Sequence, residues 1–487
     1  MPPSPKSPQK AITIALVNPP SDLVEEAGRF ARVYNLIPPL GIAYIAANLK
    51  KSGFNTICLD AGGGRLSLKG LTEELKRHSP QIVGVTATTF AIPSAKALIE
   101  RVRGVLPGTI TVIGGAHISA VPERGMEESG AHLGIIGEGE KAMVEIAEAL
   151  LEGKKDFKGI DGLIIRDSTG QLFKTRTRPL FRDLDSLPPP AWELMPPLKS
   201  YSATPASYRR LPVAHLFTSR GCPYRCTFCS NSVFGRSLRK HSVERVIEEV
   251  VTLVKRFGAR EVRFFDDVFT IDRERVIEIG EGILRRVGRI PWTCLTRPDL
   301  VERDFLKEIK RLGCWQILFG FESPHQKRLD DMKKGFKIEE VEEAVIWAKE
   351  AGLKVRGDFI IGLPGETVEN MRACLKFAIN SGLDMAHFNI WIPYPGAPLT
   401  RQLEEKGLIR HYDYLKYGGE GKSPKDGEVN LPHVPEGFSE AEFVAEVEKL
   451  FFSFYRRPGY ILRQALSIRT LDDIRRFWLG FKTFFLS

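Results

Sequence analysis

Residues 11–152 alternate between short apolar segments and segments whose apolar residues recur at helical spacing. Short apolar runs are typical of buried strands, and apolar positions three and four residues apart are typical of helices that cover a sheet. Strands that alternate with helices form an open parallel sheet. The pattern therefore predicts a Rossmann-like α/β domain over residues 11–152. The expected strands are residues 11–17, 55–60, 81–87, 109–115 and 132–136, and the expected helices are residues 40–50, 71–78, 92–105 and 141–151.

Three turns of this domain carry small or acidic residues where predicted strands end. They contain Thr86, the pair Gly114 and Gly115, and the pair Gly137 and Glu138. The carboxyl ends of parallel strands lie at one edge of a sheet, which is where such sheets bind ligands. Glycine lets a bulky ligand approach the backbone, and free N–H groups at helix starts bind polar groups. The turns therefore predict a cofactor-binding site at this edge of the sheet, although any doubly wound sheet has glycines at such positions.

A second alternation of strands and helices covers residues 208–400 and predicts a partial (β/α)6 barrel. Four of its predicted strands carry Asp266, Arg297, Glu322 and Gly362 near their carboxyl ends. Polar groups at the carboxyl ends of barrel strands open onto one face, where ligands bind. The expected strands are residues 261–268, 292–298, 316–323, 355–366 and 385–391, with helices at residues 242–257 and 338–350.

The remaining segments define the domain boundaries. Residues 1–10 are rich in Pro, Ser and Lys, and we expect a disordered tail there rather than a signal peptide. Residues 153–207 are expected to be a linker with a small hairpin, and their proline run breaks regular structure. Residues 401–487 are expected to be a helical C-terminal region. No apolar run is long enough to span a bilayer.

The net charge of +10 is concentrated near the C-terminus. Basic chains often meet nucleic acid, anionic lipid or acidic substrates, but no nucleic-acid-binding motif is present. Apolar residues recur at helical spacing beside Arg475, Arg476 and Lys482, a pattern suited to a membrane interface. The alternative is a terminal helix that docks on the barrel. The apolar positions are Leu471, Ile474, Phe477, Trp478, Phe481, Phe484 and Phe485.

Cys222, Cys226 and Cys229 form a C-x3-C-x2-C run. Three closely spaced soft thiolates suit an iron–sulfur cluster. A cubane has four irons, so three cysteines leave one iron open to another ligand, which indicates catalysis. The alternative is a structural zinc site, but zinc sites usually have a second pair of ligands, and none follows here.

This spacing, with Phe228 directly before Cys229, resembles the radical S-adenosylmethionine (radical SAM) superfamily. The resemblance implies a 4Fe-4S cluster on the three cysteines and SAM on the open iron, cleaved to a 5′-deoxyadenosyl radical. It also implies that Phe228 and Gly362 lie near the adenine and that Asp266 lies in the segment facing the SAM amino group. Arg297 would meet the SAM carboxylate, and Glu322 the ribose or amino group. The usual Gly-Gly-Glu letters are absent at Asp266.

Residues 11–152 resemble the cobalamin-binding domain that precedes many radical SAM domains. The resemblance lies in residues 38–44, the Gly-Gly-Ala-His turn at 114–117 and the Gly-Glu-Gly-Glu turn at 137–140. It implies bound cobalamin. Many such domains carry Asp-x-His-x-x-Gly, whose His ligates cobalt, but Asp60 is followed here by Ala-Gly-Gly-Gly. A scaffold that has lost cobalamin is the alternative.

Together, the resemblances imply a cobalamin-dependent radical SAM enzyme that methylates an unactivated carbon of a hydrophobic or lipid-like substrate. One alternative is an oxidative cyclase or rearrangement enzyme without methyl transfer. Another is a non-catalytic cobalamin or redox sensor. The expected partners are a small-molecule or lipid-like substrate and a flavodoxin- or ferredoxin-type electron donor, without nucleic acid. We expect a cytoplasmic protein with peripheral membrane contact through the C-terminal helix.

Overall fold

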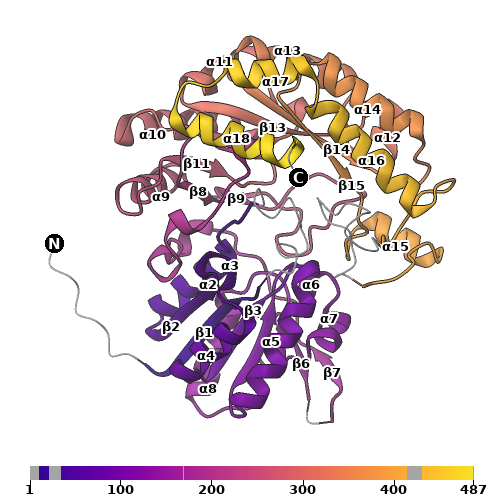
Figure 1. The fold of residues 1–487 in the computed structure, drawn as a ribbon. Coiled ribbons are helices and arrows are strands. Elements are labelled where there is room, and N and C mark those ends of the chain that lie inside the picture. Colours follow the sequence, from indigo (N-terminus) through magenta and orange to yellow (C-terminus); the bar gives the residue numbers. More distant parts are fainter. Residues whose placement is uncertain (1–9, 21–34, 168, 414–429, 486–487) are drawn as a thin grey trace. The chain divides into compact units, whose positions relative to one another are not determined.

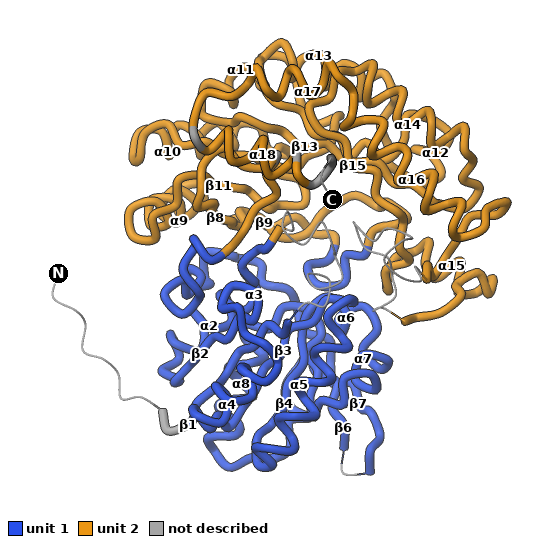
Figure 2. The backbone as a smooth tube through the Cα atoms, viewed as in Figure 1, with its two compact units in different colours: residues 1–22, 36–200, 230–235 blue, residues 23–35, 201–229, 236–487 orange. Residues whose placement is uncertain are grey.

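The computed structural model describes residues 10–20, 35–167, 169–413 and 430–485 (Figure 1). The chain divides into two compact units (Figure 2). The first takes in residues 1–22, 36–200 and 230–235, and the second residues 23–35, 201–229 and 236–487. Residues 1–9, most of the predicted disordered tail, lie outside the described residues.

The first unit contains a sheet whose strand order is β2-β1-β3-β4-β5-β6-β7. Its first five strands are parallel, and β6 and β7 add to the edge antiparallel. The hairpin expected in the linker is therefore present, and it extends the sheet. The strands are β1 Lys10–Asn18, β2 Phe54–Asp60, β3 Ile82–Thr86, β4 Ile110–Gly114, β5 Leu133–Ile135, β6 Leu163–Arg166 and β7 Leu172–Lys174.

Helices cover both faces of this sheet (Figure 1). α2 (Leu40–Lys51) and α8 (Glu140–Leu151) share one apolar core with the strands. α4 (Leu68–His78) and α5 (Ile92–Val105) share the core on the opposite face. Burial on both faces explains the continuous apolar strands, since each buried aliphatic side chain contributes about 1.5–3 kcal/mol. The shorter helices are α3 Ala61–Gly64, α6 Ala116–Ala120 and α7 Pro122–Ser129.

The second unit is built on an open, parallel six-stranded sheet of order β15-β14-β13-β12-β11-β8, which confirms the predicted partial barrel. A two-stranded antiparallel pair, β9 (Ser219–Arg220) with β10 (Arg239–Lys240), flanks the cysteine loop. The six strands are β8 Val213–Leu216, β11 Glu261–Phe264, β12 Trp292–Thr296, β13 Cys314–Glu322, β14 Lys354–Ile361 and β15 Met385–Ile390.

The strands of this sheet alternate between an apolar face and a polar face. Phe264, Phe319 and Phe359 are fully buried. The alternate positions on the same strands include Arg263 and Asp358, so one face of the sheet carries charge. The helices that follow the strands are α9 Val243–Lys255, α10 Arg273–Val287, α11 Arg303–Arg311, α12 Gln326–Asp331, α13 Ile338–Glu350 and α14 Val368–Asn380.

The C-terminal helices cover the edge strand β15. The Tyr455 hydroxyl donates to the Ala386 carbonyl at 3.0 Å and accepts from the Ala386 N–H at 3.2 Å, and the Tyr460 hydroxyl donates to the Asp384 carbonyl at 3.1 Å. These bonds satisfy edge groups that would otherwise be open to pairing. No helix of the described residues is long and apolar enough to cross a membrane. The helices are α15 Pro398–Glu405, α16 Glu440–Tyr455, α17 Pro458–Leu466 and α18 Leu471–Phe485.

Candidate cofactor-binding sites

The loop that carries the three cysteines leaves β8 and is anchored at Thr218 and Ser219. The buried Asp266 carboxylate accepts hydrogen bonds from the Thr218 N–H at 3.0 Å, from the Thr218 hydroxyl at 2.9 Å and from the Ser219 hydroxyl. Arg275 donates to the Thr218 carbonyl at 3.0 Å and to the His241 carbonyl at 2.8 Å. Buried charges held by several hydrogen bonds fix the start of the loop rigidly.

Cys222 is half-buried, Cys226 is buried and Cys229 is exposed. The three thiols lie close enough that a charge on one acts on the others, and Asp267 acts on Cys222 and Cys229. Burial raises the pKa of Cys222, and Asp267 and Cys226 add to this effect. Iron supplies the positive charge that stabilises such thiolates, so the arrangement fits a cluster held by three cysteines.

The thiols do not surround a single point as the ligands of one metal ion do. Among the described residues, no three His, Cys, Asp or Glu side chains converge in that way. A four-iron cluster is a larger body, and its thiolates bind separate irons rather than one shared tetrahedral ion. The donor set and its spacing along the loop therefore suit the cluster expected from the sequence.

The two carboxylates after β11 have different surroundings. Asp266, which the sequence assigned to SAM, has its oxygens engaged by Thr218 and Ser219 below the loop. Asp267 is exposed, and its charge acts on the Cys222 and Cys229 thiols. Asp267, rather than Asp266, is therefore the carboxylate of this turn whose charge acts on the thiols.

Arg297 is buried at the end of β12, between the rings of Tyr224 and Phe336. Its guanidinium carbon lies 3.6 Å from the Tyr224 ring centre and 5.0 Å from that of Phe336. Its Nε and Nη2 donate to the two oxygens of Asp299, both at 2.9 Å. Its Nη1 is buried without a hydrogen-bond partner. Asp299 thus occupies two donor groups of the Arg297 guanidinium, and Nη1 is the donor left for a ligand.

Glu322 ends β13 in a strained backbone conformation. Its φ is +66°, in the left-handed region that non-glycine residues rarely adopt, and the strand register shifts between Gly320 and Glu322. Lys334 donates to its carboxylate at 3.0 Å, with both side chains buried. Burial raises the pKa of Glu322 above its usual value, and Lys334 opposes that effect. The turn therefore holds a buried carboxylate, paired with Lys334, at the carboxyl end of β13.

Phe228 and Gly362 complete the set predicted for SAM. Phe228 is half-buried, and its ring centre lies 5.7 Å from the Lys334 ammonium. Gly362 has a φ of +92°, and a Cβ there would lie 2.5 Å from the Phe443 ring. Its N–H donates to Glu366 at 2.9 Å. Only glycine fits this turn, because any side chain meets both strain and Phe443.

In the first unit, the predicted cofactor residues follow three neighbouring parallel strands. Thr86 ends β3, Gly114 ends β4, and Gly137 and Glu138 follow β5. Gly115 has a φ of +107°, and a Cβ there would lie 2.6 Å from the Ala87 carbonyl oxygen. Two of the turns are joined through Ser119, which donates to the Gly115 carbonyl at 2.8 Å and accepts from the Gly137 N–H at 2.9 Å. The structure thus brings the three turns to one sheet edge.

The histidines of this unit take part in internal hydrogen bonds. His117 is fully buried, with Nε2 2.8 Å from Glu128 and Nδ1 3.2 Å from Thr89. His132 Nδ1 accepts from the Thr111 N–H at 3.0 Å. Asp60 caps α3 by accepting from the Gly63 N–H at 3.3 Å. Position 62, where the family motif has its cobalt-ligating histidine, is glycine here, and His117 and His132 are engaged in hydrogen bonds elsewhere in this unit. The glycine-lined edge is the feature that fits a flat, bulky corrin.

Lys334 and Tyr224 contact predicted site residues, and the sequence did not single them out. Lys334 lies twelve residues from Glu322 in sequence, on the turn after α12, and Tyr224 lies inside the cysteine loop. A lysine or a tyrosine in a loop carries no periodic signal. Only the pairing of Tyr224 with Arg297 and of Lys334 with Glu322 identifies them.

The fold and these sites define an α/β enzyme of two units. The first contains a sheet with a glycine-lined edge, and the second, which follows it in sequence, is a partial barrel that carries the three cysteines. Residues 28–147 match the B12 binding domain, and residues 216–378 match the radical SAM superfamily. The chain belongs to the family of cobalamin-binding radical SAM enzymes. Its cofactors are accordingly a 4Fe-4S cluster, SAM and cobalamin.

Three relatives illustrate the family. The chain is 33% identical to an uncharacterized methyltransferase of Pyrococcus horikoshii, over 93% of this chain and 95% of the relative. It is 31% identical to the anaerobic magnesium-protoporphyrin IX monomethyl ester cyclase of Rubrivivax gelatinosus, over 78% and 68%. It is 28% identical to the cytidylyl-2-hydroxyethylphosphonate methyltransferase of Streptomyces wedmorensis, over 85% and 86%.

One solved structure shares the fold over most of the chain. It is the cobalamin-dependent S-adenosylmethionine radical enzyme OxsB with aqua-cobalamin bound. The TM-score is 0.72 at 18% identity, and the match covers 97% of this chain and 71% of OxsB.

Proposed function

We propose that this enzyme transfers a methyl group to an unactivated carbon. The observation that carries the proposal is the likeness, along nearly the whole chain, to a relative named as a methyltransferase. When bound, the cluster with SAM supplies a hydrogen-abstracting radical, and cobalamin supplies a methyl group. The chain's own residues hold these cofactors and keep water away from them.

Four residues are proposed to position SAM. Arg297 Nη1 is a buried N–H donor without a protein partner, which suits the SAM carboxylate. Asp267 lies beside the thiols, where a carboxylate attracts the SAM amino group. Glu322 accepts from the ribose or amino group, and the turn at Gly362 lies near the adenine. Asp266 is proposed to hold the loop and not the cofactor.

The substrate is proposed to be amphiphilic, a lipid-like molecule with a polar group. On the charged face of the barrel sheet, Arg356 donates to Asp358 at 2.7 and 3.0 Å, and His387 lies 3.7 Å from Asp358. The charges of Arg356 and Asp358 also act on Arg263, on the third strand from β14 in the sheet order, so these groups lie on one face of the sheet. Half-buried charges on that face favour a substrate with a polar or ionised end.

Peripheral membrane contact through α18 is part of the proposal. Ile474 and Trp478 lie four residues apart on α18, and each is 51% exposed. Lys482 lies over the Trp478 ring at 5.3 Å. Exposed apolar residues beside cations suit a membrane interface, where a lipid-like substrate resides. We propose a cytoplasmic enzyme that uses a flavodoxin- or ferredoxin-type electron donor.

A second candidate is oxidative cyclisation without methyl transfer, which the likeness to the cyclase of Rubrivivax gelatinosus favours. The test is anaerobic incubation of the reconstituted enzyme with reductant, trideuteromethyl SAM and a lipid extract of the producing cells. Methyl transfer predicts 5′-deoxyadenosine together with S-adenosylhomocysteine and a deuterated lipid-like product. Cyclisation predicts 5′-deoxyadenosine without S-adenosylhomocysteine. A non-catalytic sensor predicts intact SAM.

A further inference from the structure

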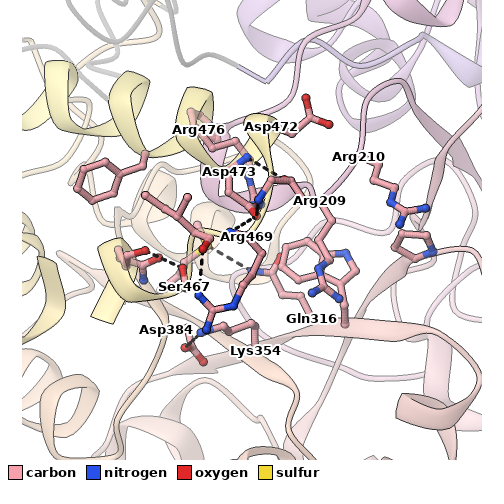
Figure 3. Close-up of a pocket in the computed structure, with 18 of the residues that line it drawn as sticks. Arg209, Arg210, Gln316, Lys354, Asp384, Ser467, Arg469, Asp472, Asp473 and Arg476 are labelled. Carbon is pink, nitrogen blue, oxygen red and sulfur yellow. Dashed lines mark hydrogen bonds and ion pairs between the residues drawn. The ribbon is translucent and has the colours of Figure 1, made fainter. Parts of the chain in front are cut away.

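The second unit contains a cavity of about 950 Å³ at the amino-terminal ends of its strands. Arg260, Pro291 and Lys354 come from the beginnings of β11, β12 and β14 or from the residues just before them, and all line the cavity. The other wall consists of α17 and α18 with the turn between them (Figure 3). The residues proposed to hold SAM follow the opposite, carboxyl ends of these strands, so this cavity is a separate site.

Cations outnumber carboxylates in the lining. Asp384, Asp472 and Asp473 are its acidic residues. Asp384 pairs with Lys354 at 2.9 Å, and Asp473 pairs with Arg476. In Figure 3, Arg469 extends toward the Lys354–Asp384 pair. The cations of the lining are Arg209, Arg210, Arg260, Arg289, Lys310, Lys354, Arg469 and Arg476.

Most of these cations have no carboxylate partner among the described residues. Arg289 and Arg260 donate to the carbonyls of Lys310 and Leu211, at 3.0 and 3.4 Å. Burial lowers the pKa of Lys310, and Arg209, Arg289 and Lys354 contribute to the shift. The positive charges therefore act on one another across the cavity, and an anion between them would relieve their repulsion.

The backbone of Arg209 and Arg210 is held in place by a buried carboxylate. The buried Glu261 carboxylate accepts from the N–H groups of Arg209 and Arg210 at 2.6 and 2.8 Å and from Trp315 Nε1 at 2.9 Å. The Arg209 guanidinium lies over the Trp315 ring at 5.8 Å. The backbone of the arginine pair is thus fixed, while both side chains stay exposed to a ligand.

We propose that this cavity binds a ligand that carries a phosphoryl group. Arginine binds phosphate oxygens through a planar fork of donors, and several arginines from separate segments of the chain suit a group with more than one negative charge. A volume of about 950 Å³ is large enough for a ligand of small-metabolite or headgroup size. A free phosphorylated metabolite and a lipid headgroup present this same chemistry.

The test is titration calorimetry of the full-length holoprotein at low salt with inorganic pyrophosphate, together with flotation on vesicles of equal parts phosphatidylcholine and phosphatidylglycerol. The pocket variant is Arg209→Gln/Arg210→Gln, which keeps both backbone N–H groups. Arg289→Gln is a second, single-site variant. The matched control is Arg372→Gln/Lys376→Gln, which removes the same charge from two exposed positions on α14, outside the cavity.

A soluble ligand predicts that the Kd for pyrophosphate rises about tenfold or more in the pocket variant and stays within about twofold in the control. A lipid headgroup predicts that vesicle flotation falls in the pocket variant, in which Ile474 and Trp478 are unchanged, and is kept in the control. The proposal is overturned if neither probe binds, or if the pocket and control variants weaken binding equally. SAM cleavage is not a readout here, so failure of this site is distinguishable from failure of the proposed reaction.

Discussion

Lys334 donates a hydrogen bond to Glu322 at 3.0 Å, and both side chains are buried. Glu322 also has a φ of +66°, and a Cβ on Gly320 would lie 2.6 Å from its carboxylate oxygen. The pair therefore links a strained strand end to the turn after α12. Strain of this kind persists only where the surroundings fix it, and it is common at functional sites.

Removing the Lys334 charge leaves the buried Glu322 carboxylate without a positive charge beside it. We expect Lys334→Met to lower the free energy of unfolding by about 3 kcal/mol, and Glu322→Gln/Lys334→Met to recover much of that loss. Urea unfolding of the full chain measures both. Lys307→Met, which breaks an exposed pair with Asp304, is the control and should leave the free energy of unfolding nearly unchanged. Equal stability of the single and double variants would contradict the pairing.

Substitutions of Asp266 and Asp267 are expected to impair different properties, iron binding in the first case and SAM binding in the second. Asp266→Ala removes the acceptor of the Thr218 and Ser219 bonds, so the cysteine loop should loosen and bound iron should fall. Asp267→Asn keeps the loop anchor, so iron content should be normal while the Kd for SAM rises about tenfold. Iron analysis and equilibrium dialysis with SAM measure the two effects. Reversed outcomes would mean that the roles are exchanged.

Gly362 should tolerate no side chain. Gly362→Ala combines a φ of +92° with a contact of 2.5 Å to Phe443, and we expect a loss of about 2–4 kcal/mol. Gly365→Ala is the matched control, because Gly365 has a φ of +70° but no atom within 4 Å of the added Cβ. It should cost about 1 kcal/mol. Thermal unfolding compares the two variants, and a control as unstable as Gly362→Ala would show that the Phe443 contact is unimportant.

Glu261 should give stability a specific pH dependence. Burial raises its pKa to about 7, although three N–H groups donate to it. The folded protein therefore holds this proton more tightly than the unfolded chain, in which the pKa is 4.5. The stability from this group is fully present below about pH 4.5 and is lost as the pH rises to about 7, a loss of up to about 3 kcal/mol.

Glu261→Gln removes that titration and keeps an oxygen acceptor. Urea unfolding at several pH values should show that the stability of the native chain, relative to Glu261→Gln, falls between about pH 5 and pH 7.5. The same slope in both proteins would mean that Glu261 does not titrate in this range.

The sequence predicted the sheets well because their signal is local. Helices α5 and α13 begin and end where the spacing of apolar residues predicts. The C-x3-C-x2-C run indicates a cluster from its spacing alone, without knowledge of the fold. The roles of Asp266 and Asp267 could not be separated in this way. One faces Thr218 and the other lies near the thiols, and this depends on the path of a turn and not on composition.

Pairings between distant residues were also beyond the sequence. The bonds of Glu261 to Arg209 and Trp315 join three separate segments, and the basic cavity exists only because α17 and α18 close over the strand starts. The basic C-terminal residues were visible in the sequence, but their cavity-facing position was not. Burial and register decide such contacts, and neither follows from periodicity alone.

The central claim is that Cys222, Cys226 and Cys229 hold a cluster that cleaves SAM. The most direct measurement is SAM cleavage to 5′-deoxyadenosine by the anaerobically reconstituted, reduced enzyme, compared with Cys226→Ala and with Cys374→Ala, whose thiol is buried on α14 away from the loop. We predict that cleavage and cluster absorbance are lost in Cys226→Ala, are kept in Cys374→Ala, and that cobalamin binds to both. Undiminished SAM cleavage by Cys226→Ala would contradict the account.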